Sequence, residues 1–196
     1  TVSTATTGGA TAFSSATDLI AVSITAVNDA PTRTAASVSL ASVNEDDTNP
    51  LGATVSALFT SAFSDATDQV TGGSSANTLA GVAIETNAAT AAQGTWQWLN
   101  GVTWTDVSTS VSTGSALVLA AGTQVRFLPA ADYNGAPGAL IVRLIDSSAG
   151  ALTSGSTIDV TTSGGTTQYS NGANVVSLTT TVTAVNDAPV ADDESF

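Results

Sequence analysis

Apolar and polar residues alternate along most of the chain. Val38 and Leu40 alternate with serines, and Leu140, Val142 and Leu144 alternate with other residues in the same way. A period of two is the strand period, and the many β-branched Val and Thr residues also favour strands over helices. The pattern predicts short strands, among them residues 36–43, 53–59, 140–145 and 175–185.

Turn signals separate these stretches, and no helical pattern lies between them. They include Gly72-Gly73, Asn100-Gly101, Asn134-Gly135 and Gly164-Gly165. Gly and Asn tolerate the backbone angles that tight turns need. Many short strands with turns between them are typical of an all-β protein, so we expect an antiparallel β-sandwich.

The chain contains an internal repeat. Residues 24–31 (the N-linker) recur as residues 182–189 (the C-linker), with seven of the eight positions identical, and the segment starting at Gly8-Gly9 resembles the one starting at Gly164-Gly165. We therefore expect a tandem-repeat organisation. Residues 1–31 would be the C-terminal strands of a preceding repeat plus its linker, residues 32–189 a complete repeat plus linker, and residues 190–196 the start of the next.

The amino-acid composition excludes several kinds of binding partner and most catalytic groups. The chain has sixteen Asp and Glu residues, three Arg, no Lys, no His and no Cys, which gives a net charge of -13. This charge repels phosphate backbones and anionic lipid, so we expect neither nucleic-acid binding nor membrane insertion. Without Cys, His and Lys, most nucleophiles, general bases and zinc ligands are missing, and we do not expect an enzyme. Carboxylate, amide and carbonyl oxygens remain, and these are the ligands of hard cations such as Ca²⁺.

The acidic residues gather where the predicted strands end. If successive strands alternate in direction, one end of the sandwich collects the N-linker cluster, which is Asn28, Asp29, Asp65, Asp68 and Asp146. The other end collects the C-linker cluster, which is Glu45, Asp46, Asp132, Asn134, Asn186 and Asp187. Crowded carboxylates repel one another unless a cation binds them, so both clusters are candidate Ca²⁺ sites. The alternative is that these residues only initiate turns.

The linker sequence Ala-Val-Asn-Asp-Ala-Pro resembles the junction motif of bacterial cadherin-like and Ig-like tandem repeats in giant secreted adhesins of the RTX type. Further segments resemble that repeat type, among them residues 63–66, 77–84, 125–129 and 143–146. The resemblance implies an Ig-like or cadherin-like sandwich that binds Ca²⁺ at its junctions, outside the cell or on the bacterial surface.

The resemblance also implies particular roles for the candidate ligands. Asn28, Asp29, Asn186 and Asp187 would belong to linker motifs, Glu45 would follow the first strand, Asp65 and Asp68 would be the paired acids after the second, and Asp132 would lie in a later loop. The expected partners are adjacent repeats of the same polypeptide or copies of the chain in a filament. The expected function is that of a calcium-stiffened spacer or filament module.

A tryptophan-rich hairpin offers a second hypothesis. Trp96, Trp98 and Trp104 flank the predicted turn at Asn100-Gly101. Exposed indole rings can stack on sugars, which would make the chain a glycan-binding module for surface glycans. In a chain this poor in aromatic residues, however, the same side chains are needed to fill the core.

Overall fold

The computed structural model describes residue 3 and residues 5–189 of the chain. The predicted start of a following repeat at residues 190–196 lies outside the described residues. Strands are β1 (Thr32–Arg33), β2 (Ser37–Ser39), β3 (Val43–Asn44), β4 (Ala53–Thr54), β5 (Phe63–Ser64), β6 (Leu79–Asn87), β7 (Gly94–Asn100), β8 (Thr103–Asp106), β9 (Ala116–Ala120), β10 (Gln124–Pro129), β11 (Leu140–Asp146), β12 (Thr157–Ile158), β13 (Val176–Thr179) and β14 (Val182–Thr183). Helical turns are α1 (Val55–Phe59), η1 (Thr60–Ala62), η2 (Ala66–Asp68), η3 (Ser147–Ala149) and η4 (Gly172–Asn174).

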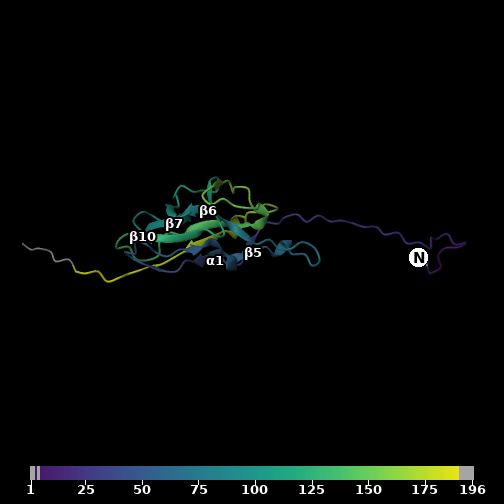
Figure 1. Ribbon diagram of the computed structural model, residues 1–196, viewed down its shortest axis with the longest axis horizontal. Coiled ribbons are helices and arrows are strands. Elements are labelled where there is room, and N and C mark those ends of the chain that lie inside the picture. The colour runs from purple at the N-terminus through teal and green to yellow at the C-terminus, as the bar shows by residue number, and fades with distance from the viewer. Residues whose placement is uncertain (1–2, 4, 190–196) are drawn as a thin grey trace, which may run out of the picture.

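The fold is all-β, as predicted, and two larger sheets share one core (Figure 1). One sheet has the strand order β4-β10-β7-β8, and the other has the order β12-β9-β6-β11-β13-β2. The pairs β1-β5 and β14-β3 form two further, two-stranded sheets. No helix in the described part of the chain is long and apolar enough to cross a membrane.

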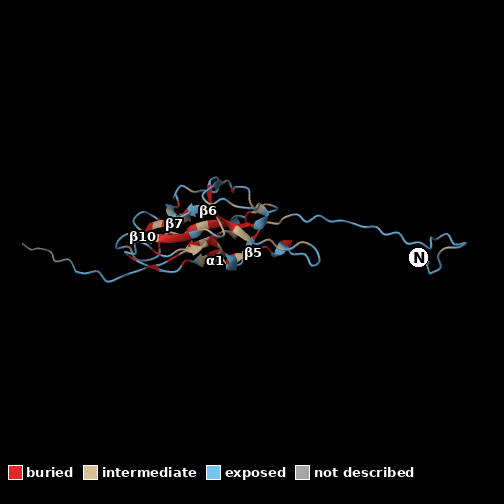
Figure 2. Cartoon of the chain, viewed as in Figure 1, coloured by how far each residue is buried: buried red, intermediate tan, exposed pale blue. Residues whose placement is uncertain are grey.

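The alternating pattern sorts side chains to the two faces of the larger sheet. Val82 and Ile84 of β6 enter the main core together with Trp96 and Phe127 of the facing sheet. Ala83, between them in sequence, joins a second, smaller cluster on the opposite face. Successive strand residues point to opposite faces, so strands buried on both faces have two sets of apolar neighbours. Figure 2 shows the buried residues concentrated along these strands.

The predicted strand over residues 53–59 is wrong. Only Ala53–Thr54 is extended, and the helix α1 follows at once. The Thr54 side chain accepts a hydrogen bond from the Ala57 backbone N–H, which caps the helix. Val55, Leu58 and Phe59 are buried, and their spacing of three and four residues is that of one helix face. The chain nevertheless reaches β5, which pairs with β1 and brings Asp65 to the end where the N-linker enters.

The expectation of a purely antiparallel arrangement is also wrong for two strand pairs. The described pairs are antiparallel except for β13 with β2 and β14 with β3, which are parallel. The segment with β2 and β3 and the segment with β13 and β14 therefore lie side by side and run in the same direction. The two ends of the chain leave the folded part on opposite sides (Figure 1).

The segment before the N-linker carries no described strand. Leu19, Ile20 and Val22 of this segment and Ile24, the first residue of the N-linker, are between 80% and 91% exposed, and the segment extends away from the sheets (Figure 2). Within it, Gly8 donates its N–H to the Phe13 carbonyl at 2.8 Å. Gly164 donates to the Tyr169 carbonyl at 2.9 Å in the folded part. The two related sequences thus form the same local turn.

Candidate metal sites

The structure brings the N-linker cluster together from three segments. Asp65 immediately precedes η2, Asp68 ends it, and Asp146 ends β11. The Asp29 backbone N–H donates to Asp68 Oδ1 at 2.8 Å, and Asn28 Nδ2 donates to Asp146 Oδ2 at 3.3 Å. The N-linker is therefore bound directly to the acidic residues of the folded part, as the strand directions predicted.

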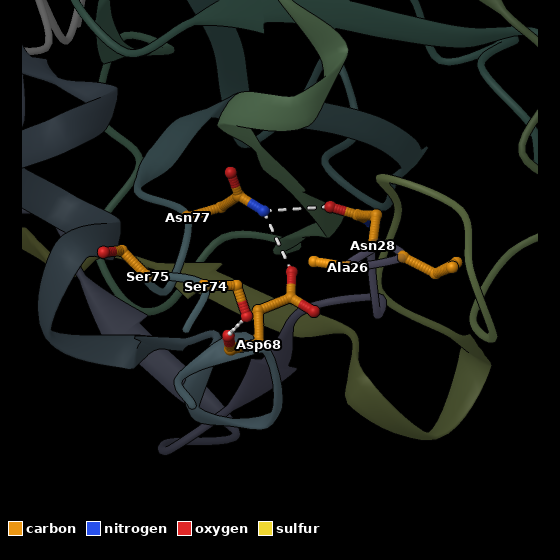
Figure 3. Close-up of a pocket in the computed structure, with 7 residues that line it drawn as sticks. Ala26, Asn28, Asp68, Ser74, Ser75 and Asn77 are labelled. Atoms are coloured by element: carbon orange, nitrogen blue, oxygen red, sulfur yellow. Dashed lines mark hydrogen bonds between the residues drawn. The ribbon is translucent and has the colours of Figure 1, made fainter. Parts of the chain in front are cut away.

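Asn77 belongs to this site, although the sequence analysis did not select it. Its Nδ2 donates to Asn28 Oδ1 at 2.9 Å and to Asp68 Oδ2 at 3.0 Å (Figure 3). Its backbone N–H donates to Asp65 Oδ2 at 2.6 Å. Asn77 also lines a pocket of about 210 Å³ with Asn28 and Asp68. Its proximity to the acids depends on the path of the loop before β6, which the strand pattern does not reveal.

Three of the four carboxylates of this cluster are buried, and Asp29 is half-buried. Asp65 is 4% exposed, Asp68 7% and Asp146 0%. Burial raises the pKa of Asp65 above its ordinary value, and the negative charges of Asp68 and Asp146 raise it further. The Asp65 Oδ1 atom is buried and has no hydrogen-bond partner. A buried oxygen without a partner is costly, so it is an orphan acceptor suited to a cation.

The arginines do not neutralise this cluster in the described structure. Arg33 donates to the Val175 carbonyl, Arg126 to Gln97, Asn49 and Pro50, and Arg143 to Glu85, Ser163 and Ser170. The chain has no Lys. Acid–acid repulsion in the cluster is therefore not balanced by a basic side chain.

Glu45 anchors the C-linker cluster. It is 4% exposed, its Oε1 accepts the Val185 N–H at 2.6 Å, and its Oε2 accepts Asn134 Nδ2 at 3.0 Å. Two further acids of this cluster, Asp46 and Asp132, have left-handed backbone conformations, with φ of 65° and 58°. Asp and Asn tolerate this conformation better than most residues. The sharp turn at each position brings the two side chains to the same end of the fold.

Three exposed acids complete the C-linker cluster. Asp46, Asp132 and Asp187 each offer a carboxylate oxygen, and these oxygens lie within 4.8 Å of one another. Desolvation raises the pKa of Asp187, and the charges of Asp46, Asp132 and Glu45 raise it further. Asn186 is exposed, and its Nδ2 donates to the Asp187 carbonyl at 3.1 Å. Among the described hydrogen bonds, none brings its side chain onto the acids.

The two linker copies share one local bond in different surroundings. Asn28 Nδ2 donates to the Asp29 carbonyl at 3.2 Å, as Asn186 does to Asp187. Asn28 and Asp29 are half-buried, whereas Asn186 and Asp187 are exposed. The N-linker has in addition the contacts of its Asn28 side chain to Asp146 and to the Thr167 carbonyl at 3.3 Å. The same motif therefore contacts acidic residues at both ends of the folded part.

The tryptophan hairpin forms as predicted, with β7 and β8 paired around Gly101. Trp96 is 0% exposed and Trp98 5% exposed, and the Trp96 ring meets Phe127 edge-on with centroids 5.1 Å apart. The half-buried Trp104 ring packs against the Arg126 guanidinium, 4.1 Å away. The exposed platform that sugar stacking requires is therefore not formed by Trp96 and Trp98. Their rings fill the core instead.

Both clusters offer what Ca²⁺ binds, namely several carboxylates with amide and carbonyl oxygens. The convergent carboxylate oxygens of Asp46, Asp132 and Asp187 favour the C-linker cluster, whereas the N-linker cluster has the buried Asp65 Oδ1, for which a cation would supply the missing partner. The chain was compared with protein-family models, curated proteins and solved structures, and nothing matches in any of the three comparisons.

Proposed function

We propose that the chain is a calcium-stiffened structural repeat, a spacer or filament module of a large bacterial cell-surface or secreted adhesin. The observation that carries the proposal is the group of three buried carboxylates against the N-linker, with one oxygen left without a partner. Ca²⁺ bound there would neutralise the acids and fix the linker to the folded part. The residues that would hold it are Asn28, Asp65, Asp68, Asn77 and Asp146.

An Ig-like or cadherin-like β-sandwich is the architecture in this proposal. Two sheets that share one core support it, as does the position of the acids at the two ends of the strands. The junction motif and the resemblance that it carries support a tandem arrangement outside the cell. The partners in this arrangement are neighbouring repeats or further copies of the chain.

The linker motif contacts acids in both of its copies. The C-linker lies against Glu45, Asp46 and Asp132, whereas the N-linker lies against Asp65, Asp68 and Asp146. In a tandem array, a linker would have the first set on one side and the second set on the other. Ca²⁺ at such a junction would bridge two repeats, so its function would be mechanical.

Thermal unfolding with Ca²⁺ or with EDTA tests the proposal. The dissociation constants typical of extracellular modules are roughly 10⁻⁴ to 10⁻³ M. At these values, 10 mM Ca²⁺ would raise the free energy of unfolding by about 1.4–2.7 kcal/mol for each site that it occupies. That corresponds to a rise in melting temperature of roughly 3–10 °C per site. Mg²⁺ at the same concentration is the control and should give a smaller rise, because it needs a tighter octahedral geometry. Equal melting temperatures in Ca²⁺ and EDTA would contradict the calcium assignment.

A further inference from the structure

The parallel pairing of an N-terminal segment, which contains β2 and β3, with the C-terminal segment, which contains β13 and β14, continues over the length of the fold. β13 pairs with β2 in the register Leu178 to Val38, and β14 pairs with β3 in the register Val182 to Val43. Between and beyond these short strands, further backbone hydrogen bonds join the same two segments. They are Ser177 N–H to the Ala36 carbonyl at 3.0 Å, Leu40 to Thr179 at 2.8 Å, Val43 to Thr181 at 3.1 Å and Glu45 to Thr183 at 2.9 Å.

Hydrogen bonds between side chains and backbone groups also join the same two segments, at both ends and in the middle. Arg33 Nη1 donates to the Val175 carbonyl at 2.5 Å near the N-linker, and Glu45 Oε1 accepts the Val185 N–H near the C-linker. Between them, Thr180 Oγ1 donates to the Ala41 carbonyl at 3.1 Å. Thr180 is 3% exposed and Glu45 4% exposed. Water therefore has little access to replace these bonds while the segments remain packed.

The direction in which the chain leaves the fold determines how tension would act on these bonds. β1 and β2 follow the N-linker directly, β14 precedes the C-linker directly, and the two ends leave on opposite sides (Figure 1). Because the two segments are parallel neighbours, pulling the chain ends apart slides one along the other. The bonds between them are then loaded together. Antiparallel neighbours pulled at one end would separate one bond at a time.

We propose that residues 33–45 and 174–185 form a shear clamp, which makes the folded part resistant to tension applied through its two ends. The inference depends on the strand arrangement and not on a cation, so it goes beyond the calcium proposal. In a tandem array, tension would reach each repeat through its linkers, and the clamp is the contact that joins them most directly. The function assigned to this pair of segments is to carry load.

Pulling the same protein in two directions tests the clamp. The chain has no Cys, so each of the two handles can be attached specifically at a Cys introduced at the chosen position. In the first geometry the handles are at residues 1 and 196. In the second they are at residue 196 and at Leu51→Cys, because Leu51 is 89% exposed and lies six residues after Glu45 at the C-linker end. The second geometry peels the two segments apart from that end.

We expect an unfolding force at least about threefold higher between the chain ends than in the peeling geometry. Equal forces would overturn the proposal. The comparison is repeated in EDTA, where the ratio should persist. If the ratio disappears in EDTA, the resistance belongs to the cation sites and the clamp is wrong. A melting temperature insensitive to Ca²⁺ would contradict only the proposed function.

A substitution within the clamp gives a second readout. Thr180→Val keeps the shape of the side chain and removes the bond to Ala41, so unfolding at constant force between the chain ends should become roughly three- to tenfold faster. The matched control is Thr60→Val, which removes the Thr60 Oγ1 bond to the Ser56 carbonyl at 2.7 Å outside the clamp. Its unfolding rate under force should stay within twofold of the original. Equal acceleration in both variants would contradict the proposal.

Discussion

At Asp65, folding and cation binding impose opposite requirements. The side chain is buried, one of its oxygens has no partner, and its pKa is raised by burial and by Asp68 and Asp146. Without a cation, the ionised carboxylate is unfavourable in this position. With a cation, the same charge becomes a ligand. A substitution at Asp65 therefore distinguishes a structural role from a metal-binding role more clearly than a substitution of an exposed acid does.

We predict that Asp65→Asn raises the melting temperature in EDTA at neutral pH and lowers it in 10 mM Ca²⁺. In the absence of Ca²⁺, the original chain binds a proton at Asp65 more readily when folded than when unfolded. Its contribution to stability is then greatest below the ordinary pKa of 3.8 and is lost as pH rises through the raised pKa. The amide introduced by Asp65→Asn does not ionise, so this loss of stability with rising pH does not occur in the variant. In Ca²⁺, the variant should lose about 1.4–2.7 kcal/mol of stabilisation, the amount expected of one weak site.

Asp106→Asn is the control for this substitution. Asp106 is exposed, and an amide oxygen can still accept the bond from Gln97 Nε2. Its melting temperatures should follow those of the original chain in both solutions. If Asp65→Asn lowers the melting temperature equally in EDTA and in Ca²⁺, the carboxylate serves only in folding, and no cation binds there.

Composition and strand direction alone brought most candidate ligands to the correct end of the fold. Asp65 reaches its place even though the element before it is a helix and not a strand, because β5 still returns to β1. Asn77 could not be found in this way, since its contacts depend on the fold of the loop before β6. The side chain of Asn186 was expected among the acids, but its described bond is to the next carbonyl.

At the scale of elements, local sequence determines turns more reliably than short strands. The period of two identified β11 and β13, whose apolar residues face a core on at least one side. The same period failed at α1, where a threonine cap and buried Val55, Leu58 and Phe59 also fit a helix. In a segment this short, contacts with the rest of the protein determine whether it forms a strand or a helix.

The repeated Gly-Gly turn is formed locally in both copies. Gly8 and Gly164 have φ of 80° and 79°, and Thr11 and Thr167 each donate a side-chain bond to the first glycine's carbonyl at 2.9 Å. Gly165 also accepts the Ala30 N–H of the N-linker at 2.7 Å. One copy thus belongs to the folded part and touches the linker, whereas the other lies in the exposed segment.

We predict that Gly164→Ala lowers the melting temperature and that Gly8→Ala does not. At each position φ is left-handed, and a Cβ would lie 2.8 Å from the Cβ of Asn171 or of Ser15. A non-glycine residue in this conformation costs about 1–2 kcal/mol before the clash is counted. The cost affects unfolding only at Gly164, because the segment around Gly8 has no contacts with the core to lose.

Gly114→Ala, where no atom lies within 4 Å of a Cβ and no left-handed φ is present, is the neutral reference for these two variants. Differential scanning calorimetry would measure all three. A similar loss in Gly8→Ala and Gly164→Ala would mean that residues 5–27 are part of the cooperative unit. The predicted boundary near residue 31 would then be wrong.

At the scale of the whole molecule, charge and linker conformation act against each other. In the proposed tandem array, the net charge of -13 would favour separation of neighbouring repeats, whereas Ca²⁺ would attract acids from both sides to one linker. Ala30-Pro31 and Ala188-Pro189 already favour an extended backbone, because Pro fixes φ and restricts the residue before it. Ca²⁺ would then limit bending without having to create the extended linker.

The last prediction concerns a chain in which residues 32–189 occur twice in tandem, compared by small-angle X-ray scattering in Ca²⁺ and in EDTA. The expected radius of gyration is larger in Ca²⁺, because a bridged linker bends less. Charge neutralisation alone would have the opposite effect, since removing repulsion lets the repeats approach, and at 0.15 M salt the screening length is only about 8 Å. Asp187→Ala in the central linker should keep the EDTA dimensions in Ca²⁺. Equal dimensions of the unsubstituted tandem chain in the two solutions would contradict the stiffening role, even if each repeat binds the ion.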